Sequence, residues 1–203
     1  MLENYNIVLA SASPRRIEMF CRHGIKPFVA PAGVEENLPF GAGARRAVMF
    51  LALKKGLYTE SGLLEKDASF FKKLSGRPLI VSADTVVCLR DTILGKPETE
   101  EEAFRMLKAL CGKTHQVATG VCFIFPRSGR KHVFCEVTQV RMKDYGDREI
   151  LDYIATGEPM DKAGAYAIQG GWKDYVQDFS GDYDNIVGFP WKRAQQEIGC
   201  LEL

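Results

Sequence analysis

The 203-residue sequence has no apolar run close to the roughly 20 residues that a membrane helix needs. Its first residues, Met1 to Tyr5, lack the basic start and apolar core of a signal peptide. The six cysteines are scattered singly, without a CxxC pair or a Cys/His cluster, so neither a zinc site nor a disulfide framework is indicated. We therefore expect a soluble, cytoplasmic protein with reduced cysteines.

An excess of one charge is also missing. The chain has 27 basic and 26 acidic residues, a formal net charge of +1, so no global field attracts nucleic acid or a membrane. It contains no internal repeat, low-complexity tract or dividing linker. We expect one domain over residues 1–203.

Several common catalytic signatures are absent as well. Neither a Walker loop nor a GxGxxG fingerprint is present, which disfavours ordinary P-loop and dinucleotide chemistry. No GxSxG elbow occurs, and His23, His115 and His132 are isolated in the sequence. A Ser-His-Asp hydrolase is therefore disfavoured.

What the sequence does have is a carboxylate within an apolar run. Residues 80–88 read as a buried strand, yet Asp84 and Thr85 lie at its centre. An ionised carboxylate in such a place is normally paired, metal-bound or functional. A lone Asp could equally pair locally where a strand meets a loop.

A second polar segment follows the first expected strand, residues 6–10. In Ser11-Ala12-Ser13-Pro14-Arg15-Arg16, Ser13 suits an N-cap and Pro14 the first helical position. Free N–H groups, the helix dipole and two guanidinium groups would favour a bound phosphate. The alternative is an ordinary capped helix with solvated arginines.

The remaining pattern predicts a mixed α/β sheet, with ligands bound in a crevice beyond the strand ends. A helix over 42–58 is expected to stop at Gly56, and 57–78 reads as an irregular surface excursion with a helical piece at 70–74. Further elements are expected as follows: strands at 26–31, 116–125 and 132–142, the last two forming a hairpin, and helices at 99–112, at 148–155 and from Trp191.

Charged residues gather at the ends of these elements. The cations are Arg15, Arg16, Lys55, Lys96 and Lys162, and the carboxylates are Glu35, Glu36, Asp84 and Asp161. Cations combined with metal-capable carboxylates are the means of phosphoryl-type transfer, in which catalysis is mostly positioning and charge stabilisation. The residues thus favour an enzyme that cleaves a phosphoanhydride or a phosphate ester.

Six segments together resemble the Maf family, in that family's order and over nearly the whole chain. They are residues 9–16, 82–87, 95–97 (Gly-Lys-Pro), 119–121 (Thr-Gly-Val), 161–166 (Asp-Lys-Ala-Gly-Ala-Tyr) and 181–190. The resemblance implies a nucleoside triphosphate pyrophosphatase that releases a monophosphate and pyrophosphate with a divalent metal, Mg²⁺ or Mn²⁺. It also implies a long, twisted mixed sheet flanked by helices, with two lobes around a central cleft, as in the inosine triphosphatase fold.

The resemblance also assigns roles to residues. Asp84 falls on the proton acceptor, and Glu36, with Glu35 as the alternative by a slip of one, joins Asp84 in metal binding. Lys55 and Lys96 fall on phosphate-handling positions, and the segment after the first strand adds Ser11, Ser13, Arg15 and Arg16 to the predicted phosphate-binding residues. Arg15, Thr85 and Gln169 fall on the positions that separate subgroups, and here they resemble the dTTP/UTP subgroup.

Partners and departures complete the expectation. A nucleoside triphosphate is the expected substrate and a homodimer the expected assembly, without nucleic acid or membrane. The rings of Phe189 and Trp191 stand where the family is usually aliphatic, and Trp172 after Gly171 is also unusual; both departures bear on the shape of the base pocket. The open alternative is a non-catalytic nucleotide-binding regulator of septum formation.

Overall fold

The computed structural model describes residues 1–36, 41, 43–74 and 76–201. Within them a seven-stranded mixed sheet has the order β2-β1-β3-β5-β6-β7, with the short β4 paired to β3. The strands β2, β1 and β3 run parallel, and the remaining pairs are antiparallel. The strands are β1 (Asn6–Leu9), β2 (Phe28–Val29), β3 (Pro78–Leu89), β4 (Thr92–Leu94), β5 (Thr114–Phe125), β6 (Arg130–Met142) and β7 (Val176–Ser180).

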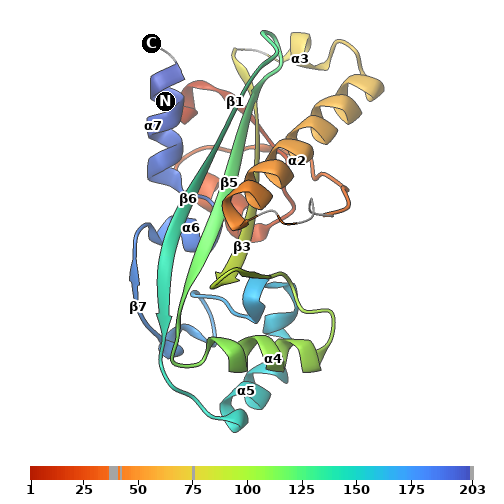
Figure 1. The fold of residues 1–203 in the computed structure, drawn as a ribbon. Coiled ribbons are helices and arrows are strands. Elements are labelled where there is room, and N and C mark those ends of the chain that lie inside the picture. The colour runs from red at the N-terminus through yellow and green to blue at the C-terminus, as the bar shows by residue number, and fades with distance from the viewer. Residues whose placement is uncertain (37–40, 42, 75, 202–203) are drawn as a thin grey trace.

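Helices cover the sheet on both faces and at one end (Figure 1). They are α1 (Pro14–Arg22), α2 (Ala44–Lys66), α3 (Phe70–Lys73), α4 (Glu100–Leu110), α5 (Asp147–Ile154), α6 (Tyr183–Val187) and α7 (Trp191–Leu201). Single 3₁₀ turns are η1 (Leu2–Asn4), η2 (Glu158–Asp161), η3 (Ala163–Ala165) and η4 (Lys173–Tyr175). The expected α/β class, with a long mixed sheet flanked by helices, is confirmed.

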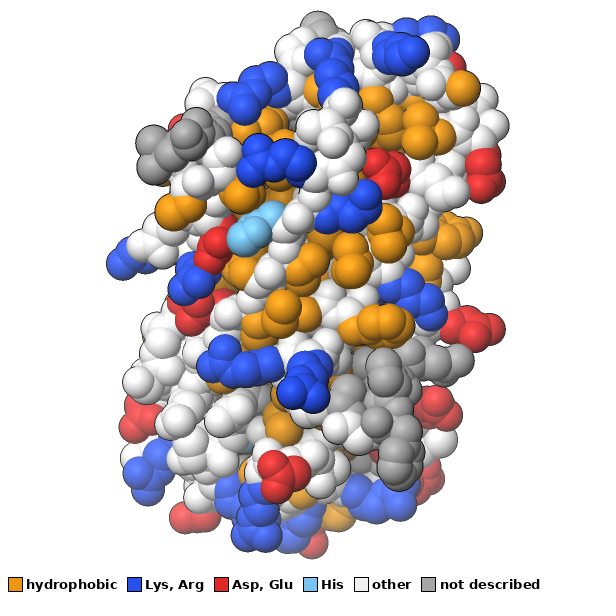
Figure 2. Space-filling model, turned by 45° about the horizontal axis from the view of Figure 1, so that its top comes forward, with side chains coloured by type: hydrophobic (Ala, Val, Ile, Leu, Met, Phe, Trp, Pro, Cys, Tyr) orange, Lys and Arg blue, Asp and Glu red, His pale blue; other side chains and the backbone are white. Residues whose placement is uncertain are grey.

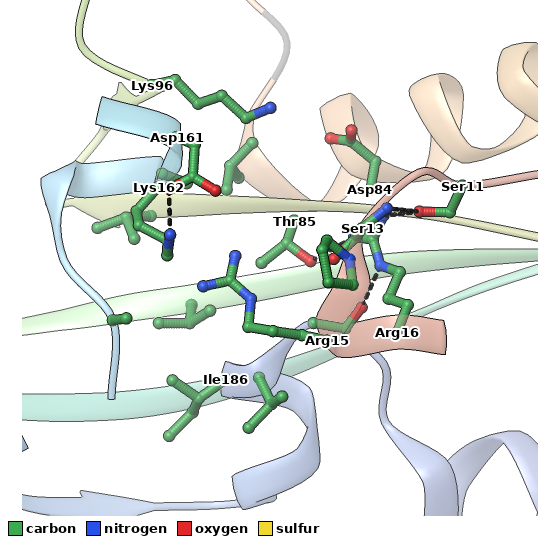
Figure 3. A pocket seen from close by; sticks show the side chains of 18 of the residues that line it. Ser11, Ser13, Arg15, Arg16, Asp84, Thr85, Lys96, Asp161, Lys162 and Ile186 are labelled. Carbon is green, nitrogen blue, oxygen red and sulfur yellow. Dashed lines mark hydrogen bonds and ion pairs between the residues drawn. The ribbon is translucent and has the colours of Figure 1, made fainter. Parts of the chain in front are cut away.

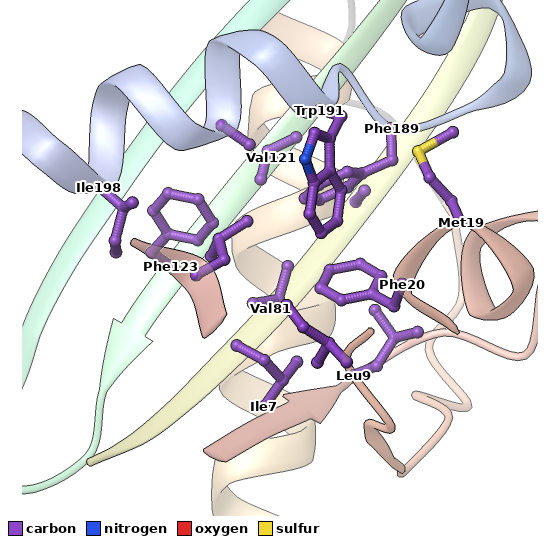
Figure 4. Packing of buried hydrophobic residues seen from close by; sticks show 14 of the residues in the cluster. Ile7, Leu9, Met19, Phe20, Val81, Val121, Phe123, Phe189, Trp191 and Ile198 are labelled. Atoms are coloured by element: carbon purple, nitrogen blue, oxygen red, sulfur yellow. The ribbon is translucent and has the colours of Figure 1, made fainter. Parts of the chain in front are cut away.

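Alternation along β3 builds two cores on opposite faces of the sheet. Ile80 faces α2, where it packs with Ala52, Cys122 and Ile124. The next residue, Val81, faces the other way, into the core shared with α1 and α7 (Figure 4). The labelled members of that second core are Ile7, Leu9, Met19, Phe20, Val81, Val121, Phe123, Phe189, Trp191 and Ile198.

The helix expected to end at Gly56 continues to Lys66, so that stop signal and the irregular excursion directly after it are wrong. Gly56 is in mid-helix because α2 approaches the sheet closely there: a Cβ on it would lie 2.9 Å from both Ser82 Oγ and Ile124 Cδ1. Gly120 of β5 serves the same approach, since a Cβ on it would lie 2.3 Å from the carbonyl oxygen of Val48. The expected start of the helix at Ala42 lies outside the described residues.

Other expected elements are confirmed with smaller differences. The 116–125/132–142 hairpin is present as β5 and β6, and the piece at 70–74 is α3. Pro14 begins α1 and Ser13 occupies the N-cap position, but the Ser13 side chain makes no capping hydrogen bond. The strand expected at 26–31 shortens to Phe28–Val29, and β7 and α6 were not expected.

The unusual rings belong to the cores. Phe189 and Trp191 pack with Phe20 in the α1/α7 core, with ring centroids 5.0 and 5.2 Å from that of Phe20. Trp172 is buried beneath α4 and α5, in the core at the other end of the sheet. None of the three is among the residues that line the cleft described below, so these rings bear on its shape only through the segments they hold in place.

The surface mixes the two signs of charge. Figure 2 shows lysine and arginine side chains scattered among acidic and apolar ones, without a face of one sign in this view. Within the described residues, none of the helices has the length and apolar character to cross a membrane.

Candidate active site

A cleft of about 830 Å³ lies where β1, β3 and α2 face the segments after β4 and α5. The β1–α1 loop contributes Ser11 and Ser13, the first turn of α1 contributes Arg15 and Arg16, and β3 contributes Asp84 and Thr85. Further lining residues include Glu36, Lys55, Lys96, Glu158, Asp161, Lys162, Tyr166, Gln169 and Gly188. The cleft thus brings together the residues for which the sequence predicted a site role, except Glu35, the alternative to Glu36.

Asp84 and Glu36 meet at one ammonium group. Lys55 Nζ, projecting from α2, lies 2.6 Å from a carboxylate oxygen of Asp84 and 2.6 Å from one of Glu36. The Asp84 and Lys55 side chains are 7% and 12% exposed, whereas that of Glu36 is half exposed. Of the roles considered for Asp84, the structure thus shows an ion pair, and both Asp84 and its partner Lys55 line the cleft.

The two carboxylates differ electrostatically. Burial raises the pKa of Asp84, an effect that the attraction of Lys55 and Arg16 only partly offsets. At Glu36 burial also acts to raise the pKa, but the hydrogen bond and charge of Lys55, with Lys96 and Arg16, outweigh it and lower the pKa. A carboxylate whose proton affinity is raised in a cleft is suited to accept a proton.

The same pair fits a divalent cation. Glu36 and Asp84 present oxygens close enough to share one ammonium, and Mg²⁺ typically takes one or two carboxylates together with substrate phosphates. Among the described residues no group of three or more His, Cys, Asp or Glu side chains is arranged to hold a metal alone. The backbone carbonyl of Glu35 accepts a hydrogen bond from Lys54, and its side chain does not line the cleft, which favours Glu36 as the ligand.

Arg16 holds the backbone around Asp84. Its Nη1 donates to the carbonyl of Ala83 (2.8 Å) and its Nη2 to Thr85 Oγ1 (3.0 Å), which are the two residues that flank Asp84. It also donates to Ser11 Oγ (3.2 Å) and from Nε to the carbonyl of Gly188 (2.8 Å) (Figure 3). Since these bonds use four of the five guanidinium N–H donors, at most one is left for the phosphate role predicted for Arg16.

The other predicted cations extend freely into the cleft. Figure 3 shows the side chains of Arg15 and Lys96 reaching into the space between the β1–α1 loop and η2. Lys162, which the sequence named only as a cation, pairs with Asp161, and its side chain is 14% exposed. Burial acts to raise the pKa of Asp161, but Lys162 and Arg15 lower it overall, so this carboxylate is ionised.

Thr85 is committed to protein partners. Thr119 Oγ1 donates to the carbonyl of Asn185 (3.0 Å), so the proton between Thr119 and Thr85 (2.9 Å) comes from Thr85. Thr85 therefore accepts from Arg16, donates to Thr119 and has no donor left for a base. Gln169, by contrast, is exposed, lines the cleft and has no hydrogen bond to any described residue.

Sequence reasoning missed this supporting network. Thr119 and Asn185 are fully buried, and Asn185 Nδ2 donates to the carbonyl of Val117 (2.9 Å) and to Thr138 Oγ1 (3.0 Å). A polar residue inside an apolar strand, which drew attention to Asp84, was the signal available for Thr119. Nothing in the sequence marks the carbonyl of Gly188 as an acceptor for Arg16.

A buried carboxylate held against a lysine, within a cleft edged by further cations, defines an enzyme that handles phosphate groups. A family model described as Maf-like protein matches residues 6–199. The chain belongs to the Maf family.

Relatives match over almost their whole length. A dTTP/UTP pyrophosphatase of Agathobacter rectalis is 43% identical over 199 residues, which cover 96% of this chain and 97% of the relative. One of Caldicellulosiruptor saccharolyticus is 45% identical over 186 residues, covering 91% and 88%. One of the archaeon Thermococcus kodakarensis is 42% identical over 200 residues, covering 96% and 98%.

Proposed function

We propose that this protein hydrolyses the α–β bond of dTTP and UTP, giving the nucleoside monophosphate and pyrophosphate. The observation that carries the proposal is the convergence of Asp84 and Glu36 on Lys55 within a cationic cleft. The names of the relatives, all dTTP/UTP pyrophosphatases, supply the substrate class. The activity clears these triphosphates from the nucleotide pool.

The proposed general base is Asp84. Its burial and raised pKa favour accepting a proton from a water placed in line with the α-phosphorus. Lys55 fixes the carboxylate by a 2.6 Å hydrogen bond, and Arg16 holds the carbonyl of Ala83 before it and the hydroxyl of Thr85 after it. The water loses its proton to an Asp84 oxygen as the bond to phosphorus forms.

Charge on the leaving group is the second requirement. Pyrophosphate departs with added negative charge, which preorganised cations stabilise more effectively than water does. Arg15 and Lys96 extend into the cleft to meet it, and Ser11 retains a hydroxyl proton to donate, because its oxygen only accepts from Arg16 and Ser13. The free N–H groups at the start of α1 add to this stabilisation.

A divalent cation, Mg²⁺ or Mn²⁺, is proposed to bind Glu36 and Asp84 together with substrate phosphate oxygens. It would supply Lewis-acid polarisation of those oxygens. We also propose that the protein is cytoplasmic, forms a homodimer and has no nucleic-acid or membrane partner.

Base choice is proposed to depend on Gln169, whose amide offers both a donor and an acceptor to the O4/N3 edge of uracil or thymine. A site that hydrogen-bonds a base edge rejects other bases because its own polar groups are then left unpaired. dTTP and UTP differ in the 5-methyl group of the base and in the 2′-hydroxyl of the sugar but share the O4/N3 edge, and a methyl group is worth only about 1–3 kcal/mol in an apolar pocket. We therefore expect similar kcat/KM for these two.

Incubation with dTTP, UTP, CTP, GTP and ATP in Mg²⁺ or Mn²⁺, followed by product analysis, tests the proposal. We expect monophosphate and pyrophosphate, with dTTP and UTP turned over much faster than the purine triphosphates. A diphosphate and phosphate as primary products would overturn the bond assignment. Nucleotide binding without turnover of any member of the panel would favour the regulator of septum formation instead.

A further inference from the structure

The loop that carries Gln169 lies against the side chain of Glu158, which also lines the cleft. Glu158 is the first residue of η2, and its own N–H donates to Thr156 Oγ1 (3.2 Å). This fixes the start of the side chain at the end of α5. The carboxylate then reaches across to the segment 169–171, which we call the Gln169 loop.

Both oxygens of that carboxylate have a partner. The backbone N–H of Gly171 donates to Oε2 (3.1 Å), and the hydroxyl of Tyr153 donates to Oε1 (3.2 Å). Bonds to an ionised acceptor are stronger than those between neutral groups. Glu158 therefore joins α5, which holds Tyr153, to the residue two positions after Gln169.

The loop sequence matches this contact. A Cβ at Gly170 would lie 2.0 Å from Glu158 Oε1, and one at Gly171 would lie 3.2 Å from Oε2. Neither glycine has a positive φ, so space around the carboxylate, not backbone conformation, calls for glycine at 170. Glu158 can remain between the loop and α5 only while residue 170 has no side chain.

The far end of the loop is anchored separately. Trp172 is 1% exposed, and its ring lies 4.3 Å from that of Tyr175, 4.6 Å from Tyr153 and 4.9 Å from Tyr145. Gln169 is thus attached to a rigid aromatic core through two residues of glycine. Without a further tether those glycines would let Gln169 move.

We propose that Glu158 is the positioning residue for base recognition: it clamps the Gln169 loop so that the Gln169 amide faces the base. This proposal rests on the pyrimidine preference proposed above. Glu158 acts through Gln169 and not on the phosphates, so its loss reduces discrimination between bases before it reduces the chemistry.

Two substitutions at Glu158 test the clamp. Glu158→Ala removes both acceptors, and we expect kcat/KM for UTP and dTTP to fall about tenfold, equivalent to about 1.4 kcal/mol, while the slower turnover of ATP changes less than twofold. Glu158→Gln keeps an acceptor for Gly171 N–H and is expected to retain most of the preference for UTP over ATP. Gln169→Ala shows the largest loss of the UTP/ATP preference that can be expected, because Glu158 acts through Gln169.

Gly170→Ala provides an independent route to the same state. The methyl group of the new alanine must displace the Glu158 carboxylate. The single variant should therefore lower the ratio of kcat/KM for UTP to that for ATP, as Glu158→Ala does. In the Glu158→Ala background its clash partner is absent, and it should have little further effect. Such non-additivity is the signature of two residues acting through one contact.

Amide hydrogen exchange in the 169–172 segment separates this inference from the proposed function. We expect faster exchange at Gly171 in Glu158→Ala and near-wild-type exchange in Glu158→Gln, whichever nucleotide is the substrate. Faster exchange in Glu158→Ala, together with a wild type that has no pyrimidine preference, would refute the proposed function and, with it, the role of the clamp in base choice. Unchanged exchange, or an equal loss of turnover for UTP and ATP in Glu158→Ala, would overturn the clamp alone.

Discussion

At the scale of single residues, two charges of opposite sign determine what the cleft can do. Lys55 neutralises Asp84 in a place where water reaches neither side chain freely, and Glu36 completes the group from the more exposed side. An unpaired carboxylate buried at this depth would be costly. The pairing with Lys55 is what allows an acidic residue at the centre of β3.

Asp84→Asn should separate catalysis from structure. The amide keeps the shape of the side chain and one acceptor oxygen for Lys55 but cannot take a proton from water, so we expect kcat to fall by at least about 100-fold. KM and the unfolding temperature should change little, because Lys55 retains Glu36 as a partner. Steady-state kinetics and thermal unfolding measured on the same preparation check this.

Asp161→Asn is the matched control, since Asp161 lies in the same cleft but pairs with Lys162, away from Lys55. It should lose less than about tenfold in kcat. If Asp84→Asn turned over at the wild-type rate, another carboxylate would be the base. If its activity merely followed the folded fraction, Asp84 would be structural.

At the scale of elements, α2 carries Lys55 to the sheet, and its seating depends on Gly56. We expect Gly56→Ala to destabilise the protein by about 1–3 kcal/mol, because the new methyl group would press on Ser82, whose hydroxyl is already held by the carbonyl of Ala52 at 2.6 Å. Chemical denaturation measures the free energy of unfolding.

Gly62, six residues further along the same helix, provides the control. A Cβ there meets no heavy atom of the described residues within 4 Å, so Gly62→Ala should stabilise the protein by about 0.5–1 kcal/mol, the usual gain of alanine over glycine in a helix. Equal effects of the two substitutions would contradict the close approach at Gly56.

Gly56 also shows where sequence reasoning reaches its limit. A glycine after two lysines has the local pattern of a helix end, and only the tertiary contact with β3 and β5 explains why α2 continues. The long strands and the charged residues at their ends were predictable, because periodicity and buried polarity are local signals. The partners of Arg16 were not, since two are backbone carbonyls and one lies 172 positions away in the chain.

At the scale of the whole molecule, acid should weaken the fold through His115. This histidine is 2% exposed, its Nε2 contacts the Tyr166 hydroxyl at 2.7 Å, and burial lowers its pKa to about 4. Between that value and the unfolded pKa of about 6.5, the unfolded chain binds more protons than the folded one. Stability therefore is full above about pH 6.5 and falls as the pH drops toward 4, by up to about 3 kcal/mol.

Urea unfolding at a series of pH values measures this dependence. His115→Leu should make the free energy of unfolding less dependent on pH over the same interval. Tyr166→Phe keeps the buried imidazole and should leave that dependence unchanged. If His115→Leu lost stability with falling pH as steeply as the wild type, other groups would cause the loss of stability in acid.

The bond from Arg16 to the carbonyl of Gly188 has a consequence for the order in which the protein becomes active. During synthesis, Gln169 and every charged residue that lines the cleft are incorporated before residue 188. Until then Arg16 lacks one of its four acceptors, while those at Ser11, Ala83 and Thr85 are already in the chain. We therefore expect the site to be complete only after the segment from α6 to α7 has folded onto the sheet, although all of its charged side chains are already in the chain by then.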